Sequence, residues 1–77
     1  MSPQNTVLLH LLRQRPRTTG ELFKQYGIGR AGARVLELRA AGYDIHTELV
    51  PVPTRYGEVT RVARYVLLAE PEAGVAA

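Results

Sequence analysis

The chain has 77 residues and carries ten lysines and arginines against seven acidic residues, a formal net charge of +3. It contains no cysteine, which excludes disulfide bridges and thiolate zinc sites and fits a cytoplasmic location. The length suits one small domain without an internal cavity, and no apolar run approaches the length of a membrane-spanning helix. Nine of the ten cations are arginine, a side chain suited to phosphate and guanine contacts, so the composition favours a nucleic-acid partner.

The first stretch predicts a helix that begins after Ser2 and runs to about Gln14. Serine is a good N-cap and Pro3 suits the first helical turn, whereas Pro16 stops the helix. Leu9 lies off the apolar face of this helix. The residues expected on the inner face are Val7, Leu8, Leu11 and Leu12.

A second, short helix is predicted after Thr18. A threonine followed three residues later by Glu21 matches a capping box, in which the two residues satisfy each other's backbone amides. Gly27 is the expected end of this helix. The residues expected to be buried are Leu22, Phe23 and Tyr26.

A third helix is predicted from Arg30 to Gly42. It follows a tight corner in which Gly27 and Gly29 bracket Ile28. Its inward stripe at helical spacing is formed by Ala31, Val35 and Leu38. The residues expected on the opposite face are Arg30, Ala33, Arg34 and Glu37. Leu36, like Leu9, lies off the core stripe.

Two strands and a tail complete the chain. Residues 43–50 alternate between apolar and polar side chains, which predicts a half-buried strand. Residues 51–58 are expected to form a long hairpin loop, because two prolines remove backbone donors from a ladder. The return strand is expected over 59–68 with Tyr65 facing inward, and a stretch around Thr18 could add a third strand. Residues 69–77 are expected to be a flexible tail, which leaves one domain over residues 1–68.

The order helix, helix, turn, helix, strand, loop, strand is that of an α+β winged helix-turn-helix domain, with three helices followed by a β-hairpin wing. Particular residues also carry a family resemblance: the glycine–isoleucine corner, Ala33, Arg34, Val35, Leu38, Arg39, Gly42, Ile45, Thr47 and the stretch 62–67. In these residues the chain resembles the short winged helix-turn-helix proteins of bacteriophages and mobile elements and, more distantly, the DNA-binding domain of the biotin repressor. The resemblance implies DNA binding through the third helix and the wing.

The third helix carries the residues expected to enter the major groove of double-stranded DNA. Arg30 and Arg34 lie one turn apart, and the small side chain of Ala33 lets the backbone approach the bases. Arg34 could instead form an ion pair with Glu37 or Glu21.

Further DNA contacts are expected on either side of this helix. Arg17 and Thr18 open the second helix, where amides and a hydroxyl commonly hold a phosphate. Arg55 lies in the wing loop, a position suited to the minor groove or the backbone.

Catalysis and metal binding are not expected. The two histidines, His10 and His46, lie on different elements and outside any metal-ligand spacing. The acidic residues form no pair placed for acid–base chemistry. We therefore expect neither an enzyme nor a bound cofactor.

Two functions compete at this point. The first is a small transcriptional regulator, an excisionase-like or architectural factor, or a replication accessory of a phage or mobile element. The alternative is an interaction module that binds a polymerase, a nuclease or another nucleic-acid machine, with Leu9 or Leu36 as a self-association or partner surface. One positive surface formed by the site arginines favours DNA, whereas neutralising acids and an exposed leucine patch favour a protein partner.

Overall fold

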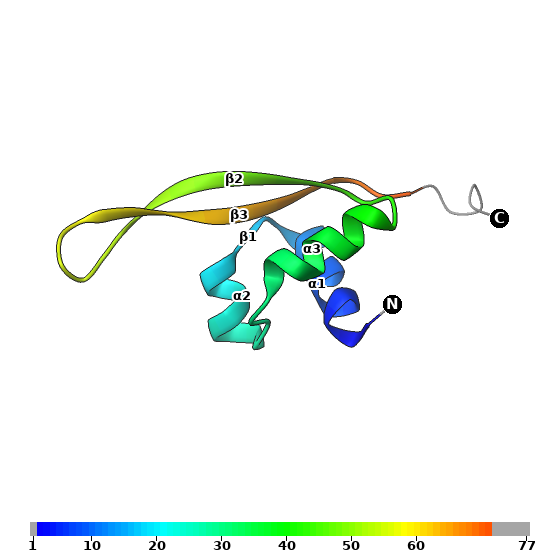
Figure 1. Ribbon diagram of the computed structural model, residues 1–77, viewed down its shortest axis with the longest axis horizontal. Helices are drawn as coiled ribbons and strands as arrows, with labels where there is room; N and C mark the ends of the chain where they lie inside the picture. Colours follow the sequence, from blue (N-terminus) through cyan, green and yellow to red (C-terminus); the bar gives the residue numbers. More distant parts are fainter. Residues whose placement is uncertain (1, 72–77) are drawn as a thin grey trace.

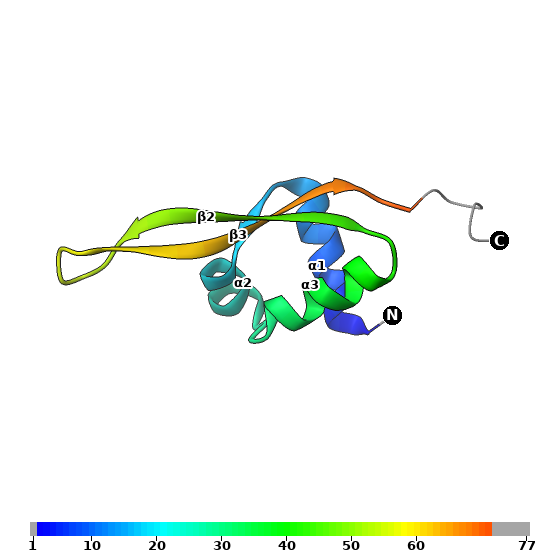
Figure 2. The ribbon, with the colours of Figure 1, turned by 45° about the horizontal axis from the view of Figure 1, so that its top comes forward.

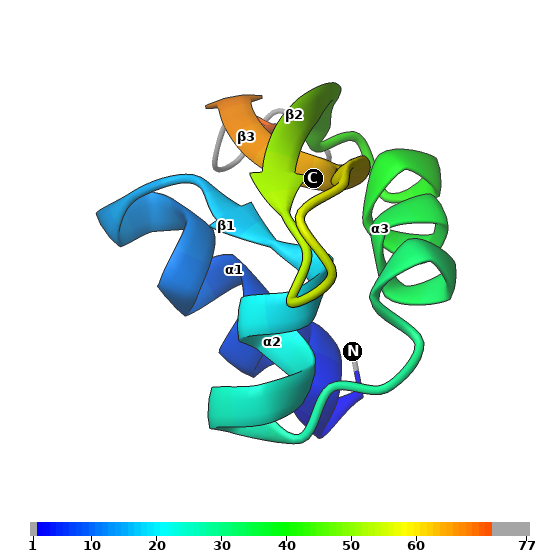
Figure 3. The ribbon, with the colours of Figure 1, turned by 90° about the vertical axis from the view of Figure 1, so that its left-hand side faces the viewer.

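The structure is a computed structural model that describes residues 2–71, so most of the predicted tail lies outside the described residues. These residues form three helices and three strands in the order α1, β1, α2, α3, β2, β3. The helices lie on one face of an antiparallel sheet, and the hairpin of β2 and β3 projects well beyond them (Figure 1). In the turned view of Figure 2 the hairpin again projects beyond the helices, with α2 and α3 below it. Figure 3, which looks along the hairpin, shows α1 and α3 on either side beneath the sheet. The α+β class is therefore confirmed.

Helix α1 spans Pro3–Gln14, as its cap and its proline predict. The Ser2 Oγ accepts a hydrogen bond from the Asn5 backbone amide at 3.2 Å. Leu9 is only 3% exposed, whereas Val7 is 43% exposed, so both of these predictions are wrong. The reason is that α1 packs against both α3 and β3, which requires a different and wider apolar face than one stripe provides.

Strand β1 is Arg17–Thr18, and its pairing with β3 supplies the third strand that the sequence left open. Helix α2 follows as Thr19–Tyr26, capped by the Thr18 Oγ1, which accepts from the Glu21 amide at 3.1 Å. The Glu21 side chain does not complete the capping box, because it pairs with arginines instead.

Helix α2 contributes one buried side chain to the core, that of Leu22. The predicted burial of Phe23 and Tyr26 is wrong, since they are 63% and 41% exposed. A helix of eight residues rests on the core along a narrow strip, and the aromatic side chains on its flanks remain in solvent.

The corner between α2 and α3 forms as predicted. Gly27 adopts a φ of 70°, a conformation that glycine reaches without strain, and ends α2. Ile28 is 2% exposed and anchors the corner in the core. Helix α3 spans Ala31–Ala40, and its predicted inward stripe is confirmed because Val35 and Leu38 are each 1% exposed.

Strands β2 (Asp44–Pro53) and β3 (Val59–Ala69) form a longer hairpin than predicted. Strand β2 continues through Pro51 and Pro53, so the loop expected over 51–58 is confined to residues 54–58 and the prediction is wrong for 51–53. The sheet order β1-β3-β2 makes β2 an edge strand. The two prolines are two residues apart, so their missing donors share one side, and an edge strand can turn that side to solvent.

The inward face of the sheet is the predicted one, with Tyr65 7% exposed and Ile45 3% exposed. Ala63 and Leu67 pack against the same core. Leu49, the cross-strand partner of Ala63, is already 65% exposed, and the hairpin continues past the helices (Figure 1). At the other end, β3 extends to Ala69, so the structured part of the chain passes the predicted boundary at residue 68.

Candidate nucleic-acid interface

Arg17, predicted to hold a phosphate, is a core residue of the fold. Its side chain is 4% exposed. Its Nε donates to the Leu11 carbonyl at 3.2 Å, its Nη2 to the Gln14 Oε1 at 2.8 Å, and its Nη1 to the Glu21 carboxylate at 2.7 Å. Pairing with Tyr65 in the sheet turns the side chain inward, so the guanidinium donates to partners within the fold.

Glu21 forms ion pairs with two arginines at the junction of α1, β1 and α2. It accepts hydrogen bonds from both Arg15 and Arg17. Burial raises the pKa of Glu21, but the hydrogen bonds from Arg17 and Arg15 more than reverse this, and the net pKa is lowered. Neighbouring Thr18 is half-buried, and its oxygen already caps α2. The side chains predicted to hold a phosphate at this junction are therefore largely occupied by hydrogen bonds within the fold.

Arg34 lies at the edge of α3 that faces α1, and its side chain is 25% exposed. Its Nη2 donates to the Glu37 Oε2 at 3.2 Å, and its Nε lies 3.1 Å from the Glu37 Oε1. The Asn5 Nδ2 on α1 donates to the same Oε1 at 3.1 Å. Of the alternatives for Arg34, the structure shows the ion pair with Glu37, so this arginine does not stand free on the outer face.

Arg30 is exposed at the N-cap position of α3, and its side chain forms no cap hydrogen bond. Ala33 is half-buried, while Leu36 is 64% exposed and Ala40 is also exposed. The outer face of α3 therefore presents Arg30, which forms no ion pair within residues 2–71, together with small side chains, an exposed leucine and the half-exposed Glu37.

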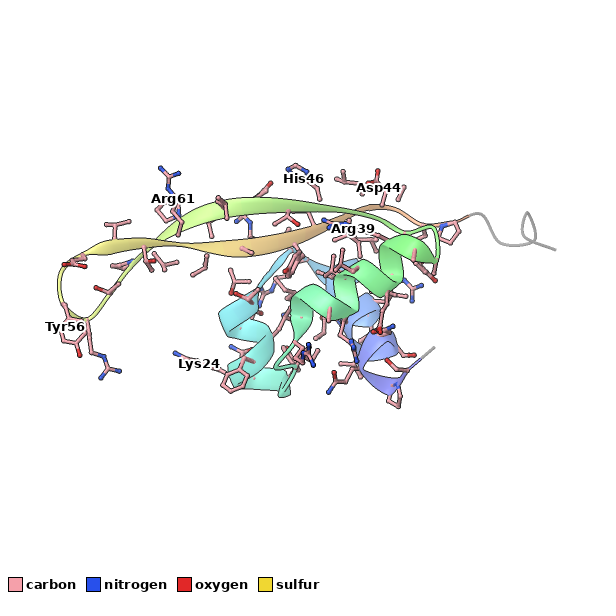
Figure 4. All side chains as sticks on the ribbon, viewed as in Figure 1. Lys24, Arg39, Asp44, His46, Tyr56 and Arg61 are labelled. Atoms are coloured by element: carbon pink, nitrogen blue, oxygen red, sulfur yellow. The ribbon has the colours of Figure 1, made fainter. Side chains whose placement is uncertain are left out.

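Other exposed cations lie on α2 and on the hairpin. Arg55 is exposed in the loop between β2 and β3, beside Tyr56, which is 84% exposed at the tip. Lys24 extends from α2 on the side below the hairpin, whereas Arg61 points away from the helices (Figure 4). Arg39 lies between α3 and the sheet, where it donates to the Ile45 carbonyl.

Partners divide the cations into two groups. Five arginines form ion pairs with carboxylates of the described residues: Arg13, Arg15, Arg17, Arg34 and Arg64. Within residues 2–71, the other five cations form no ion pair: Lys24, Arg30, Arg39, Arg55 and Arg61. Arg39 is hydrogen-bonded to the Ile45 carbonyl and Arg61 points away from the helices, so we keep the name open rim for Lys24, Arg30 and Arg55. From its position in the sequence, Lys24 could be either a backbone contact or a plain surface charge. In the structure, Arg15 and Arg17 occupy the carboxylate of Glu21, the acidic residue of α2, and Lys24 forms no ion pair within residues 2–71.

The fold and this distribution of charge define a class of protein. Three helices on one face of an antiparallel sheet, with a glycine corner before the third helix and a hairpin after it, make a winged helix-turn-helix domain. Residues 3–70 match the family model described as a winged helix-turn-helix domain, and the chain belongs to this family. Membership indicates DNA binding in general terms. No curated protein and no solved structure matched the chain.

Two further observations concern other kinds of site. Within residues 2–71, no group of three or more histidine, cysteine or acidic side chains is placed to hold a metal ion. None of the helices in that same part of the chain is long and apolar enough to cross a membrane.

Proposed function

We propose that the protein binds double-stranded DNA, with α3 in the major groove and the hairpin wing on the adjoining backbone or minor groove. The observation that carries this proposal is the open rim. Lys24, Arg30 and Arg55 come from α2, the start of α3 and the wing tip, the elements expected to flank one groove in a domain of this class. None of them has an acidic partner within residues 2–71, so a phosphate backbone is a suitable source of counter-charge.

The start of α3 suits the approach to base edges. Arg30 is exposed, and Ala33 presents only a methyl group. Arg34 contributes from the edge of the helix, since its guanidinium has five N–H donors and Glu37 occupies only some of them. Arg17 is not part of this proposal, and Thr18 contributes at most the hydrogen of its hydroxyl.

The biological role we propose is that of a small, non-enzymatic cytoplasmic regulator, or an excisionase-like or replication factor of a phage or mobile element. This role is supported by the resemblance to such proteins and by the basic composition.

A protein-interaction function is the second candidate, and one observation favours it. Leu36 on α3 and Phe23 on α2 are 64% and 63% exposed, and Glu37 neutralises part of the same helix. Exposed apolar groups of this size are typical of partner surfaces when they form a contiguous patch. Leu9 drops out of this candidate because it is buried.

The test is the affinity of the purified protein for a random-sequence duplex, measured by fluorescence anisotropy over a series of salt concentrations. Three phosphate contacts predict a log–log slope of about −3. Replacing Arg55 with alanine is expected to reduce the magnitude of this slope by about one unit. An absence of duplex binding at low salt contradicts the proposal and leaves the protein-interaction function.

A further inference from the structure

A polar cluster joins α1 to α3, and its members are Asn5, Arg34 and Glu37. Glu37 is the centre of the cluster, because its carboxylate accepts from Asn5 at 3.1 Å and from Arg34 at 3.2 Å. Asn5 is 6% exposed, the Arg34 side chain is 25% exposed and the Glu37 side chain is 50% exposed. The cluster thus begins in the interior and ends at a carboxylate in solvent.

The cluster is incompletely hydrogen-bonded. Among the described residues, two buried side-chain polar atoms lack a hydrogen-bond partner, and these are the Asn5 Oδ1 and the Arg34 Nε. The Arg34 Nε lies at ion-pair distance from Glu37, but the alignment is not that of a hydrogen bond. Unsatisfied buried polar groups cost stability, and apolar side chains at these positions avoid that cost. Such departures from good packing are typical of functional sites.

The position of Glu37 relates the cluster to the proposed groove-binding face. Glu37 lies four residues after Ala33, three before Ala40 and seven after Arg30, so these four residues follow one stripe of α3. Both alanines are small, so the carboxylate is the largest polar group on the stripe beyond Arg30. A carboxylate there repels phosphates and accepts a hydrogen bond from the N4 amine of cytosine.

We propose that Glu37 is a specificity-determining residue that accepts a hydrogen bond from a cytosine in the major groove. Asn5 is its positioning residue, because it holds the carboxylate from a second helix. Glu37 weakens DNA binding wherever its carboxylate meets a phosphate or a base without an amine. The carboxylate thus raises the sequence specificity of the domain at the expense of its affinity for DNA in general. This inference rests on the proposed DNA binding.

The experiment selects bound duplexes from a randomised pool with the parent, Glu37→Gln and Asn5→Ala, and then compares affinities for the selected site and a scrambled duplex. For the parent we expect a position fixed as cytosine. Glu37→Gln keeps the side-chain length and the contact to Asn5 but removes the charge. We expect it to lose the cytosine preference, or to shift it toward adenine, and to bind the scrambled duplex about 3- to 10-fold more tightly.

Asn5→Ala serves as the matched variant, because it keeps the charge of Glu37 and removes only the hydrogen bond that positions its carboxylate. Its cytosine preference should weaken while its affinity for the scrambled duplex stays at the parent value. A thermal melt establishes that each variant is folded. Glu37 lies on the exposed side of α3, so Glu37→Gln decides the proposal if Asn5→Ala does not fold.

The results also separate this inference from the proposed function. A parent that binds no duplex in a salt-dependent manner overturns both. A parent that binds without a selected position, or a Glu37→Gln variant with the parent's motif and affinity ratio, overturns only the role of Glu37.

Discussion

The junction of α1, β1 and α2 and the open rim both carry arginines, but in opposite conditions. At the junction, Arg15 and Arg17 share the carboxylate of Glu21, and the Arg17 side chain is 4% exposed. At the rim, Arg30 and Arg55 are exposed and form no ion pair within residues 2–71. A buried guanidinium is tolerated only when its N–H groups are hydrogen-bonded. The arginines of the junction therefore stabilise the fold through their partners and are not available to a ligand in the same way. The net charge alone therefore does not distinguish the two regions, whereas the ion-pair partners of each cation do.

This comparison separates two kinds of substitution. Changes at the junction and in the core beneath it should alter the free energy of unfolding with little direct effect on DNA contacts. Changes at the rim should alter DNA affinity and leave the unfolding transition in place.

The largest effect is expected from Val35→Asp, in the core beneath the rim. Val35 is 1% exposed, and a buried carboxylate without a partner costs several kcal/mol against a total stability of about 5–15 kcal/mol. We expect an unfolded protein by circular dichroism. A cooperative melt near the parent temperature would show that this face of α3 is not buried.

The next effect concerns the junction itself. Arg17→Ala is expected to lower the free energy of unfolding by about 2–4 kcal/mol, because it leaves the Leu11 carbonyl and the Gln14 Oε1 without their donor and Glu21 with Arg15 alone. Arg55→Ala at the rim is the matched control, with an expected change within about 0.5 kcal/mol. Urea denaturation measures both variants, and equal changes would remove the distinction between the two regions.

Two leucines make a third test with the same chemical change. Leu9 is 3% exposed and Leu36 is 64% exposed. Leu9→Gln is expected to cost about 2–4 kcal/mol, whereas Leu36→Gln stays within about 0.5 kcal/mol. Denaturation of the two variants side by side is the measurement. A stable Leu9→Gln variant would restore Leu9 as a surface residue.

A smaller effect is expected from pH. The pKa of Glu21 is lowered in the folded state, so the unfolded chain binds more protons than the folded chain in the acidic range. The contribution of Glu21 is therefore complete above the ordinary carboxyl pKa and is lost as the pH falls through the lowered folded value. Glu21→Gln should flatten the acid side of the stability curve, while Glu58→Gln, in which no ion pair is removed, should not. Parallel acid transitions of the parent and Glu21→Gln would contradict this.

The parts of the fold that were predictable depend on local chemistry. Ser2 and Thr18 cap their helices, and Gly27 ends α2, because each acts on backbone groups within a few residues. The misplaced residues depend on distant partners. Leu9 is buried because α1 meets two elements, and Pro51 stays in a strand because β2 is at the edge of the sheet.

The candidate site follows the same rule. The ion pair of Arg34 with Glu37 spans three residues and was one of the alternatives from sequence. The bond from Asn5 to Glu37 crosses 32 residues and depends on how α1 packs on α3. Arg17 was predicted to contact DNA because its burial depends on the pairing of β1 with β3. That pairing joins residues far apart in the sequence and is not encoded near Arg17.

The central claim is that DNA is held by the open rim rather than by the paired arginines. It is tested most directly by the salt dependence of duplex binding for two double variants, Lys24→Ala with Arg55→Ala and Arg13→Ala with Arg64→Ala. Each removes two cations, but the second pair is already bound to Glu70 and Glu48. We predict that the rim variant reduces the magnitude of the log–log slope by about two units and that the paired variant changes it by less than about half a unit. Equal changes, or a parent without salt-dependent binding, would contradict the account.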